Sequence, residues 1–242
     1  MHLTIEPAIL YFGTPVVLLS TLNEDGTPNL APMSSAWWLG WRAMLGLGAS
    51  GKTFANLQRT RECVLNLPSA DQVQAVDRLA LLTGSNPVPP VKHERGYRHE
   101  KDKFGVAGLT PVDSETVGPP RVEECAVQLE ASVVAIHGLA DEDDRLRGRL
   151  MAIEARIHRV HALPSILMSG QSDRIDPDKW RPLIMSFQHF YGLSPHKLLD
   201  SRLASIPESK YRIPAAGRTG PAGLTAPDVR SPARPPDYAV EK

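Results

Sequence analysis

The residues best suited to chemistry lie in one short stretch, GLGASGKTFANLQ, at residues 46–58. Its glycine spacing matches both G-x-G-x-x-G, typical of dinucleotide-binding domains, and G-x-x-x-x-G-K-T, the phosphate-binding loop of many NTPases. Both patterns hold an anion on the free backbone N–H groups at the start of a helix. Ser50, Lys52 and Thr53 would add two hydroxyl groups and an ammonium. The stretch therefore predicts a phosphate-binding site, with a capped surface helix and a solvated lysine as the alternative.

The rest of the chain does not supply what either nucleotide-binding fold needs. A dinucleotide-binding domain requires a series of β-α units after its fingerprint, so that a parallel sheet is buried on both faces. An NTPase requires a second acidic residue at the end of a buried strand. The one approximation, near Asp141, begins a charged run typical of a solvated hairpin. The phosphate site is therefore expected on a different fold.

Short apolar strands dominate the sequence. Residues 16–22 and 27–38 flank an Asp25-Gly26 turn and predict a β-hairpin. Further strands are predicted at residues 42–48, 63–67, 126–136 and 152–162. At least five short strands and few helices predict a mainly β fold with peripheral helices, in which an antiparallel barrel is favoured over a doubly wound parallel sheet.

Helices are expected at the periphery of this barrel. One covers residues 51–59 with Ser50 as its N-cap, and a second begins at a capping box in residues 69–72. A third helix-like run covers residues 195–206. Residues 84–121 carry six prolines and are predicted to be irregular.

Composition excludes several classes of partner. Lys and Arg (27) balance Asp and Glu (27), so nucleic acid and anionic membranes are not expected to bind. Cys63 and Cys125 lie beside apolar residues, which predicts two reduced, buried thiols. With no recognisable secretory signal or membrane-spanning run, a cytoplasmic location is expected. Residues 1–212 form the expected domain, and residues 213–242, rich in Pro, Gly and Ala, a flexible tail.

Several segments, in this order and spacing, resemble one known family. They are STLNEDGTPNLAPMSSAWW, GLGASGKTFANLQRTRECVLNLPSA and DKFGVAGLTPV, followed by PPRVEECAVQLEA and WRPLIMSFQHFYGL. Together they span residues 10–205 and resemble the flavin reductase-like family, whose fold is the FMN-binding split β-barrel. The resemblance implies a homodimer with FMN at the subunit interface. It also implies that flavin takes hydride from NADH or NADPH, and in some members passes to a partner monooxygenase.

The same resemblance implies cofactor-binding residues for FMN, with FAD as the alternative. Those beside the isoalloxazine ring and the ribityl chain are Ser34, Ser35 and Ala36. Those of the phosphate-binding turn are Ser50, Lys52 and Thr53, with Asn56 one helical turn further on.

Aromatic and basic residues near these segments are candidates for a substrate pocket. Trp37 and Trp38, with Trp41, form a bulky cluster just after the flavin segment. Such a cluster predicts either core or dimer packing or the wall of a pocket for an aromatic small molecule. Lys103 and Phe104 are candidates for the lip of this pocket.

Two pairs containing histidine complete the candidates. His189 and Tyr191 alternate on an expected strand and therefore share a face. The resemblance places them near the flavin edge, where either could orient a substrate, with packing as the alternative. His158 and His161 would lie on opposite faces of a strand unless a bulge intervenes, and no metal site is predicted.

Three functions are consistent with these patterns. The first is an FMN-dependent oxidoreductase that transfers hydride from NAD(P)H to flavin. The second is a split-barrel flavoenzyme that retains FMN and acts directly on an organic small molecule in a biosynthetic pathway. The third is a non-enzymatic flavin or haem carrier. In each case the residues singled out are expected to bind rather than react, since a flavin carries its own redox chemistry.

Overall fold

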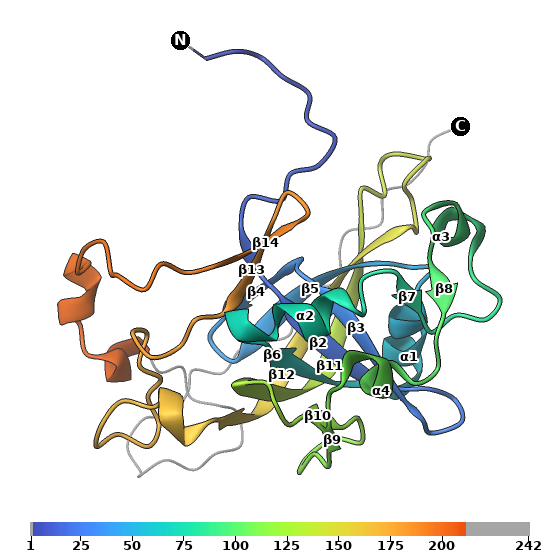
Figure 1. The fold of residues 1–242 in the computed structure, drawn as a ribbon. Coiled ribbons are helices and arrows are strands. Elements are labelled where there is room, and N and C mark those ends of the chain that lie inside the picture. The colour runs from blue at the N-terminus through green and yellow to red at the C-terminus, as the bar shows by residue number, and fades with distance from the viewer. Residues whose placement is uncertain (1, 212–242) are drawn as a thin grey trace, which may run out of the picture.

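A seven-stranded antiparallel sheet forms the centre of the computed structural model, which describes residues 2–211 (Figure 1). The predicted tail at residues 213–242 lies outside the described residues. In spatial order the strands are β3 (Pro28–Met33), β2 (Val17–Leu22), β6 (Glu62–Leu67), β11 (Val127–Leu139), β12 (Leu150–Ala162), β5 (Arg42–Gly48) and β4 (Ala36–Leu39). The predicted mainly β, antiparallel architecture is confirmed.

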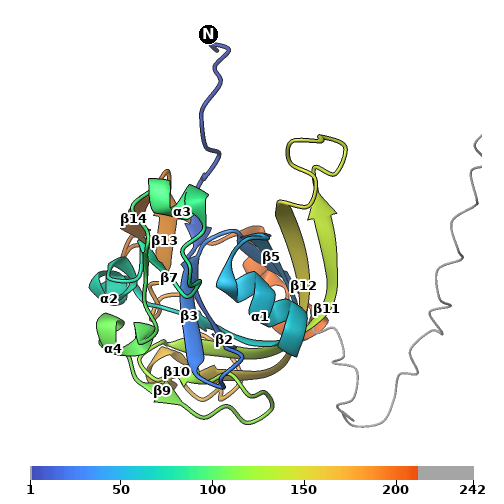
Figure 2. The ribbon, with the colours of Figure 1, turned by 90° about the vertical axis from the view of Figure 1, so that its right-hand side faces the viewer.

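The hairpin and the central strands follow the apolar pattern of the sequence. Strands β2 and β3 pair from Val17–Met33 to Leu22–Pro28, around a turn in which Gly26 adopts a φ of 78°. A positive φ is readily accessible to glycine, which explains the Asp-Gly signal. Figure 2 shows the sheet curling around the first helix, α1 (Lys52–Thr60).

Three smaller sheets lie around the central one. Strand β13 (Leu183–Ser186) pairs with β1 (Thr14–Pro15) on one side and with β14 (His189–Gly192) on the other. Strand β9 (Pro111–Val112) pairs with β10 (Arg121–Val122). Strand β7 (Leu82–Thr83) pairs in parallel with β8 (Arg98–His99). The pairing of β7 with β8 gives regular structure to part of residues 84–121, the segment predicted to be irregular. The same segment contains the short helices α3 (Pro90–Glu94) and α4 (Lys103–Ala107).

Two hydrophobic clusters hold these layers together, and strand β2 contributes to both. Val17 and Leu19 point into the interior of the curled sheet, where Leu57 of α1 also packs. Leu18 and its neighbour Val16 lie in the second cluster, under the helices α2 (Val73–Asp77) and α4. Because both faces of β2 are buried, its first half, residues 17–19, is a continuous apolar run rather than an alternating one.

The helices depart from the sequence predictions in three places. Helix α1 begins one residue later than expected, and its N-cap is Gly51 rather than Ser50. The capping box at Ser69 is confirmed, but a 3₁₀ turn precedes α2, which ends at Asp77. The helix predicted at residues 195–206 is wrong, since only a 3₁₀ turn forms at Arg202–Ser205.

The failed helix has a clear physical reason. Leu198 and Leu199, the apolar residues of that run, are 97% and 83% exposed. A short helix without a surface to pack against is marginal in water, whatever its propensity. Within residues 2–211, no helix is both long enough and apolar enough to cross a membrane.

Candidate functional site

The quoted glycine-rich stretch joins the end of β5 to the start of α1. The Gly51 N–H bonds the carbonyl of Gly48 (3.3 Å), and Gly51 in turn accepts from Ala55 (3.2 Å). The N-cap therefore has an extended backbone and no side chain of its own to fold back on the helix. The first N–H groups of a helix have no intrahelical acceptor. They begin here with Lys52 and Thr53, and so present donors and positive charge together.

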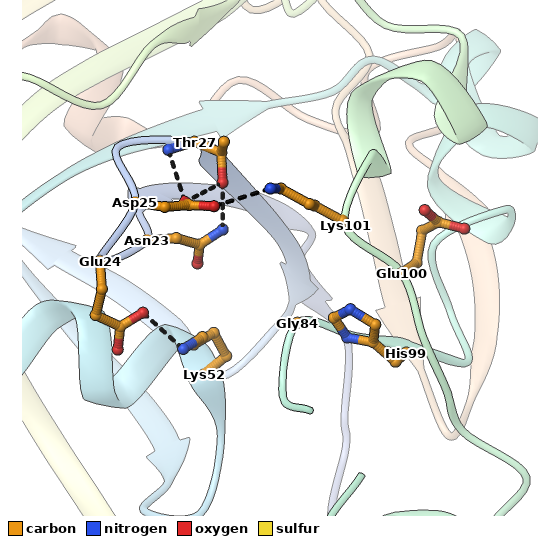
Figure 3. Close-up of a pocket in the computed structure, with 9 residues that line it drawn as sticks. All are labelled: Asn23, Glu24, Asp25, Thr27, Lys52, Gly84, His99, Glu100 and Lys101. Carbon is orange, nitrogen blue, oxygen red and sulfur yellow. Dashed lines mark hydrogen bonds and ion pairs between the residues drawn. The ribbon is translucent and has the colours of Figure 1, made fainter. Parts of the chain in front are cut away.

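Lys52 already holds an anionic oxygen. Its Nζ lies 2.8 Å from a carboxylate oxygen of Glu24, which stands on the β2–β3 turn (Figure 3). The hydrogen bond from Lys52 lowers the pKa of Glu24. A cavity of about 280 Å³ opens beside this pair, and Figure 3 shows Gly84, His99 and Lys101 lining it from the opposite side.

Behind Lys52, a buried network of amides and hydroxyls fixes the first turn of α1. Asn29 Nδ2 donates to Thr53 Oγ1 and to Thr21 Oγ1, both at 3.2 Å. Asn56, which is fully buried, donates to Thr21 Oγ1 (3.1 Å) and to Asn23 Oδ1 (3.0 Å). These bonds tie α1 to β2 and β3. Thr53 accepts from Asn29, so its own hydroxyl proton is available to another acceptor.

The Oδ1 atom of Asn56 is an exception within this network. It is buried, and it has no hydrogen-bond partner among the described residues. Most buried polar atoms are satisfied. An unpaired acceptor behind the first turn of α1 is therefore a local feature that packing alone does not explain.

Two further ammonium groups approach the same helix start. Lys103, 4% exposed, donates to Asn29 Oδ1 at 2.9 Å. Burial and the positive charge of Lys92 lower the pKa of Lys103 to about 8, against the opposing effect of Glu100. Lys92 Nζ donates to Thr83 Oγ1 at 3.3 Å. Burial lowers the pKa of Lys92 as well.

The residues predicted to lie beside the flavin ring form the link between β3 and β4. The carbonyl of Ser35 accepts from Gly46 N at 2.7 Å, and that of Ser34 accepts from Ala36 N at 2.9 Å. A side chain at Gly46 would begin 3.0 Å from the Ser35 Cβ, so glycine is what allows this close approach. Strand β5 therefore runs from the ring-side segment to the phosphate-side turn.

Trp37 and Trp38 lie on opposite faces of β4, and Trp41 lies in the turn that follows. Trp37 is 57% exposed, and Leu39, two residues further along the strand, is 71% exposed. Trp38 packs against the interior cluster together with Trp41, and its Nε1 is buried without a partner among the described residues. Only Trp37 among the three is therefore placed to meet another molecule directly.

The remaining pocket candidates are not gathered at one place. Phe104 is 4% exposed and packs in the second hydrophobic cluster, which differs from its expected position at a pocket lip, as does the burial of Lys103. His189 and Tyr191 do share an exposed face of β14. Strand β14 lies well away from α1 in both views, so one chain does not bring these residues to the phosphate-side turn (Figures 1 and 2).

A bulge changes the expected orientation of the histidine pair on β12. The register of β12 against β11 skips His158. Its Nε2 lies 2.8 Å from Ser132 Oγ, and His161 Nε2 lies 2.8 Å from Glu130 Oε1. In the part of the chain that the structure describes, no group of three His, Cys, Asp or Glu side chains is placed to hold a metal ion.

Both cysteines are buried, as the sequence predicts. Burial raises the pKa of the Cys63 thiol to about 12, and it raises the pKa of Cys125 further. Thiols of this kind are unreactive, because the thiolate is the nucleophilic form.

Sequence reasoning missed three contributors to the site: Glu24, Asn29 and Lys92. Each lies outside the glycine-rich stretch and reaches it only through tertiary contacts. Asn29 stands in a segment already quoted for the family resemblance, PNLAPMSS, which was the one signal available for it. Nothing local marks Glu24 or Lys92 as different from other surface charges.

Comparison with known proteins identifies the family. The sequence model described as "Flavin reductase like domain" matches residues 9–194, so the chain belongs to the flavin reductase-like family. The Bacillus subtilis (strain 168) protein YdfE is 43% identical over 189 residues, which cover 78% of this chain and 88% of YdfE.

Solved structures with low sequence identity share the fold. Flavoredoxin of Desulfovibrio vulgaris (Miyazaki F) superposes with a TM-score of 0.67 at 20% identity, covering 85% of this chain and 99% of its own. Nitrilotriacetate monooxygenase component B from Bacillus cereus gives a TM-score of 0.64 at 18% identity, covering 82% and 99%. The fold is thus that of the flavin reductase-like split barrels, as the sequence resemblance implies.

The corner at the start of α1 fits the phosphate of a flavin nucleotide. It combines free helix N–H groups, the ammonium groups of three lysines and a hydroxyl with a free proton. A phosphate monoester carries nearly two negative charges and three acceptor oxygens, which match this set of donors.

Proposed function

We propose that this protein is an FMN-dependent oxidoreductase that transfers hydride from NADH or NADPH to flavin. Family membership supports the flavin, and the cationic corner at the start of α1 is the observation that most supports a flavin bearing a terminal phosphate. In this proposal the helix N–H groups, Ser50, Lys52 and Thr53 hold the phosphate, with Asn56 behind them. Ser34, Ser35 and Ala36 lie beside the ring and the ribityl chain.

In this arrangement the flavin and the protein have separate roles. Bound FMN supplies the redox-active ring, and the protein contributes position, charge and exclusion of water. The Ser35–Gly46 contact holds the ring-side segment flat against β5. The Asn29–Thr53 bond fixes the hydroxyl on the phosphate side. Both groups are therefore set before the ligand arrives, which reduces the entropy lost on binding.

A homodimer with the site at the subunit interface completes the proposal. Trp37 and Leu39 form an exposed apolar pair on β4, an edge strand of the main sheet. Exposed apolar side chains on an edge strand favour coverage by another subunit. A partner subunit is also what would bring His189 and Tyr191 to a flavin, because β14 lies away from α1 within one chain.

Transfer of reduced flavin to a partner monooxygenase is the proposed biological use. The support is the structural likeness to a protein named as the component B of a monooxygenase. The use of flavin as a released product would suit the open cavity beside Lys52.

Stopped-flow absorbance with FMN-loaded protein tests the proposed function. Rapid loss of the oxidised flavin band on mixing with NADH or NADPH is expected. A flavin that stays bound and does not respond to either nucleotide would favour the enzyme acting directly on an organic substrate, or a carrier. Failure to bind flavin in any form would contradict both enzyme functions and leave only the haem carrier.

A further inference from the structure

The segment from β7 to α4, residues 82–107, folds back over the start of α1. Its closest approach is at Gly84, where a side chain would begin 2.6 Å from Asn29 Oδ1 and 3.1 Å from Lys52 Cγ. Any Cβ there would collide with the amide that fixes Thr53, so glycine is required. The parallel pairing of Thr83 with His99 then returns the chain to the same corner.

This fold-back brings Lys92 to the helix start. A side chain on Gly51, the N-cap of α1, would begin 3.7 Å from Lys92 Nζ. The same ammonium donates to Thr83 Oγ1 and lies 5.5 Å from the ring centroid of Tyr97. Both neighbours are neutral, so the positive charge faces the first turn of α1 without a carboxylate beside it.

Lys103 reaches the corner from behind. Within residues 2–211 its one hydrogen bond is to Asn29 Oδ1, and the Nδ2 of that same amide donates to Thr53. The side-chain amide of Asn29 therefore links the Lys103 ammonium, through two hydrogen bonds, to Thr53, a predicted phosphate ligand. A lysine ammonium has three donors, and at 4% exposure the other two have little access to water.

The carboxylates that line this corner belong to Glu24, Asp25 and Glu100, and none of them forms an ion pair with Lys92 or Lys103. Within residues 2–211, ion pairs closer than 4.0 Å join Lys52 to Glu24, but none involves Lys92 or Lys103. Burying an ammonium without an anionic partner costs free energy. The repulsion between Lys92 and Lys103 adds to that cost. An anion carrying two charges would offset both.

We propose that Lys92 and Lys103 are specificity-determining residues of the phosphate site, and that they make it selective for ligands ending in a doubly charged phosphate monoester. Lys92 contacts the phosphate directly. Lys103 positions Asn29 and Thr53 and supplies charge from behind. This inference rests on the proposed flavin site, and it gives residues 82–107 the role of closing that site.

The test compares FMN with riboflavin, which lacks the phosphate, by titration against the wild type, Lys92→Met and Lys103→Met. Each variant is expected to lose roughly tenfold or more in FMN affinity, with riboflavin affinity unchanged. Arg95→Met is the matched control and should leave FMN affinity unchanged, because Arg95 is a cation of the same segment that is exposed and does not line the cavity. FMN affinities within about twofold of the wild type in both variants would overturn the proposal.

A second readout keeps this test separate from the proposed function. Inorganic phosphate is expected to raise the midpoint of thermal unfolding of the wild type above that in chloride of equal ionic strength. This gain should be lost in Lys92→Met, whose side chain is partly exposed and tolerant of change. If no flavin binds while the phosphate effect depends on Lys92, the flavin assignment fails and the anion site stands. An equal phosphate effect in Lys92→Met contradicts the anion site itself.

Discussion

Two regions of the molecule bury charge, and they differ in how fully the charge is partnered. Glu130, fully buried on β11, accepts hydrogen bonds from the backbone N–H groups of Glu115 (2.9 Å) and Thr116 (2.6 Å), and from His161 (2.8 Å). Arg121 lies 3.7 Å away. Burial alone would raise the pKa of Glu130, but the bonds from Thr116, Glu115 and His161 lower it.

The corner at the start of α1 shows the opposite condition. Lys103 is nearly as buried as Glu130, yet its one hydrogen-bond partner among the described residues is a neutral amide. A charge whose bonds are all satisfied within the chain anchors structure, here the loop of residues 113–120. A charge left without an opposite partner indicates a place for a ligand. The predictions below test whether the two regions divide in this way.

Removing the satisfied charge should affect stability alone. Glu130→Ala leaves two backbone N–H groups and His161 without their acceptor and opens a cavity at a fully buried position, and should lower the free energy of unfolding by about 3 kcal/mol. Urea denaturation measures this. The exposed neighbour Glu115, changed to Ala, should cost less than about 1 kcal/mol. Wild-type stability in Glu130→Ala, or a selective loss of FMN affinity, would break the distinction between the two regions.

Raising the pH should weaken binding at the unsatisfied corner. FMN affinity is expected to fall as pH rises through about 8, the pKa of Lys103 in the free protein, by at most about tenfold per pH unit. The charged groups facing it are Lys92, whose pKa is also lowered by burial, and Glu100, whose pKa is lowered by the hydrogen bond from the Asp102 N–H. Fluorescence titration between pH 7 and 10 measures the effect. Riboflavin affinity should stay flat, and so should FMN affinity in Lys103→Met.

The stability of the free protein should change with pH in the opposite direction to FMN affinity. The pKa of Lys103 is lowered by folding, so the unfolded chain binds more protons above pH 8. The contribution of Lys103 to the free energy of unfolding therefore rises with pH from about 8 until the unfolded lysine also loses its proton. Urea unfolding of wild type and Lys103→Met across this range should differ in slope. Identical slopes would show that Lys103 carries no buried charge.

The smallest expected effect comes from Glu24, whose carboxylate forms an ion pair with Lys52. Glu24→Gln removes an anion that competes with phosphate, and should tighten FMN binding by a few-fold, in line with the worth of an exposed ion pair. Asp25→Asn, on the same turn but paired with Lys101, should leave the affinity unchanged. Weaker binding in Glu24→Gln would mean that Glu24 supports the site rather than competes for it.

Local sequence patterns predicted the parts of the fold that local physics determines. The β2–β3 hairpin follows from an apolar run and one Asp-Gly turn, and the first turn of α1 from its glycines. The N-cap is Gly51 rather than Ser50 because backbone angles, not residue preference, decide which residue directly precedes the helix. Residues 195–206 have helical spacing but meet no surface.

Only part of the candidate site could be predicted from the sequence. Lys52 and Thr53 stand in a recognisable motif, whereas Lys92 arrives through a two-residue parallel pairing within a proline-rich segment. Such long-range contacts leave no periodic signal. Lys103 was recognised as a candidate, but its place behind Asn29, rather than at a pocket lip, depends on burial that no motif encodes.

The central claim is that the turn at residues 50–53 binds the phosphate of a flavin nucleotide, and calorimetric titration of Lys52→Ala with FMN and with riboflavin tests it most directly. We expect FMN affinity to fall by about 1.5–3 kcal/mol, because a charge-assisted contact is lost, while riboflavin affinity and the fold are unchanged. Equal FMN affinity in the variant and the wild type would contradict the account.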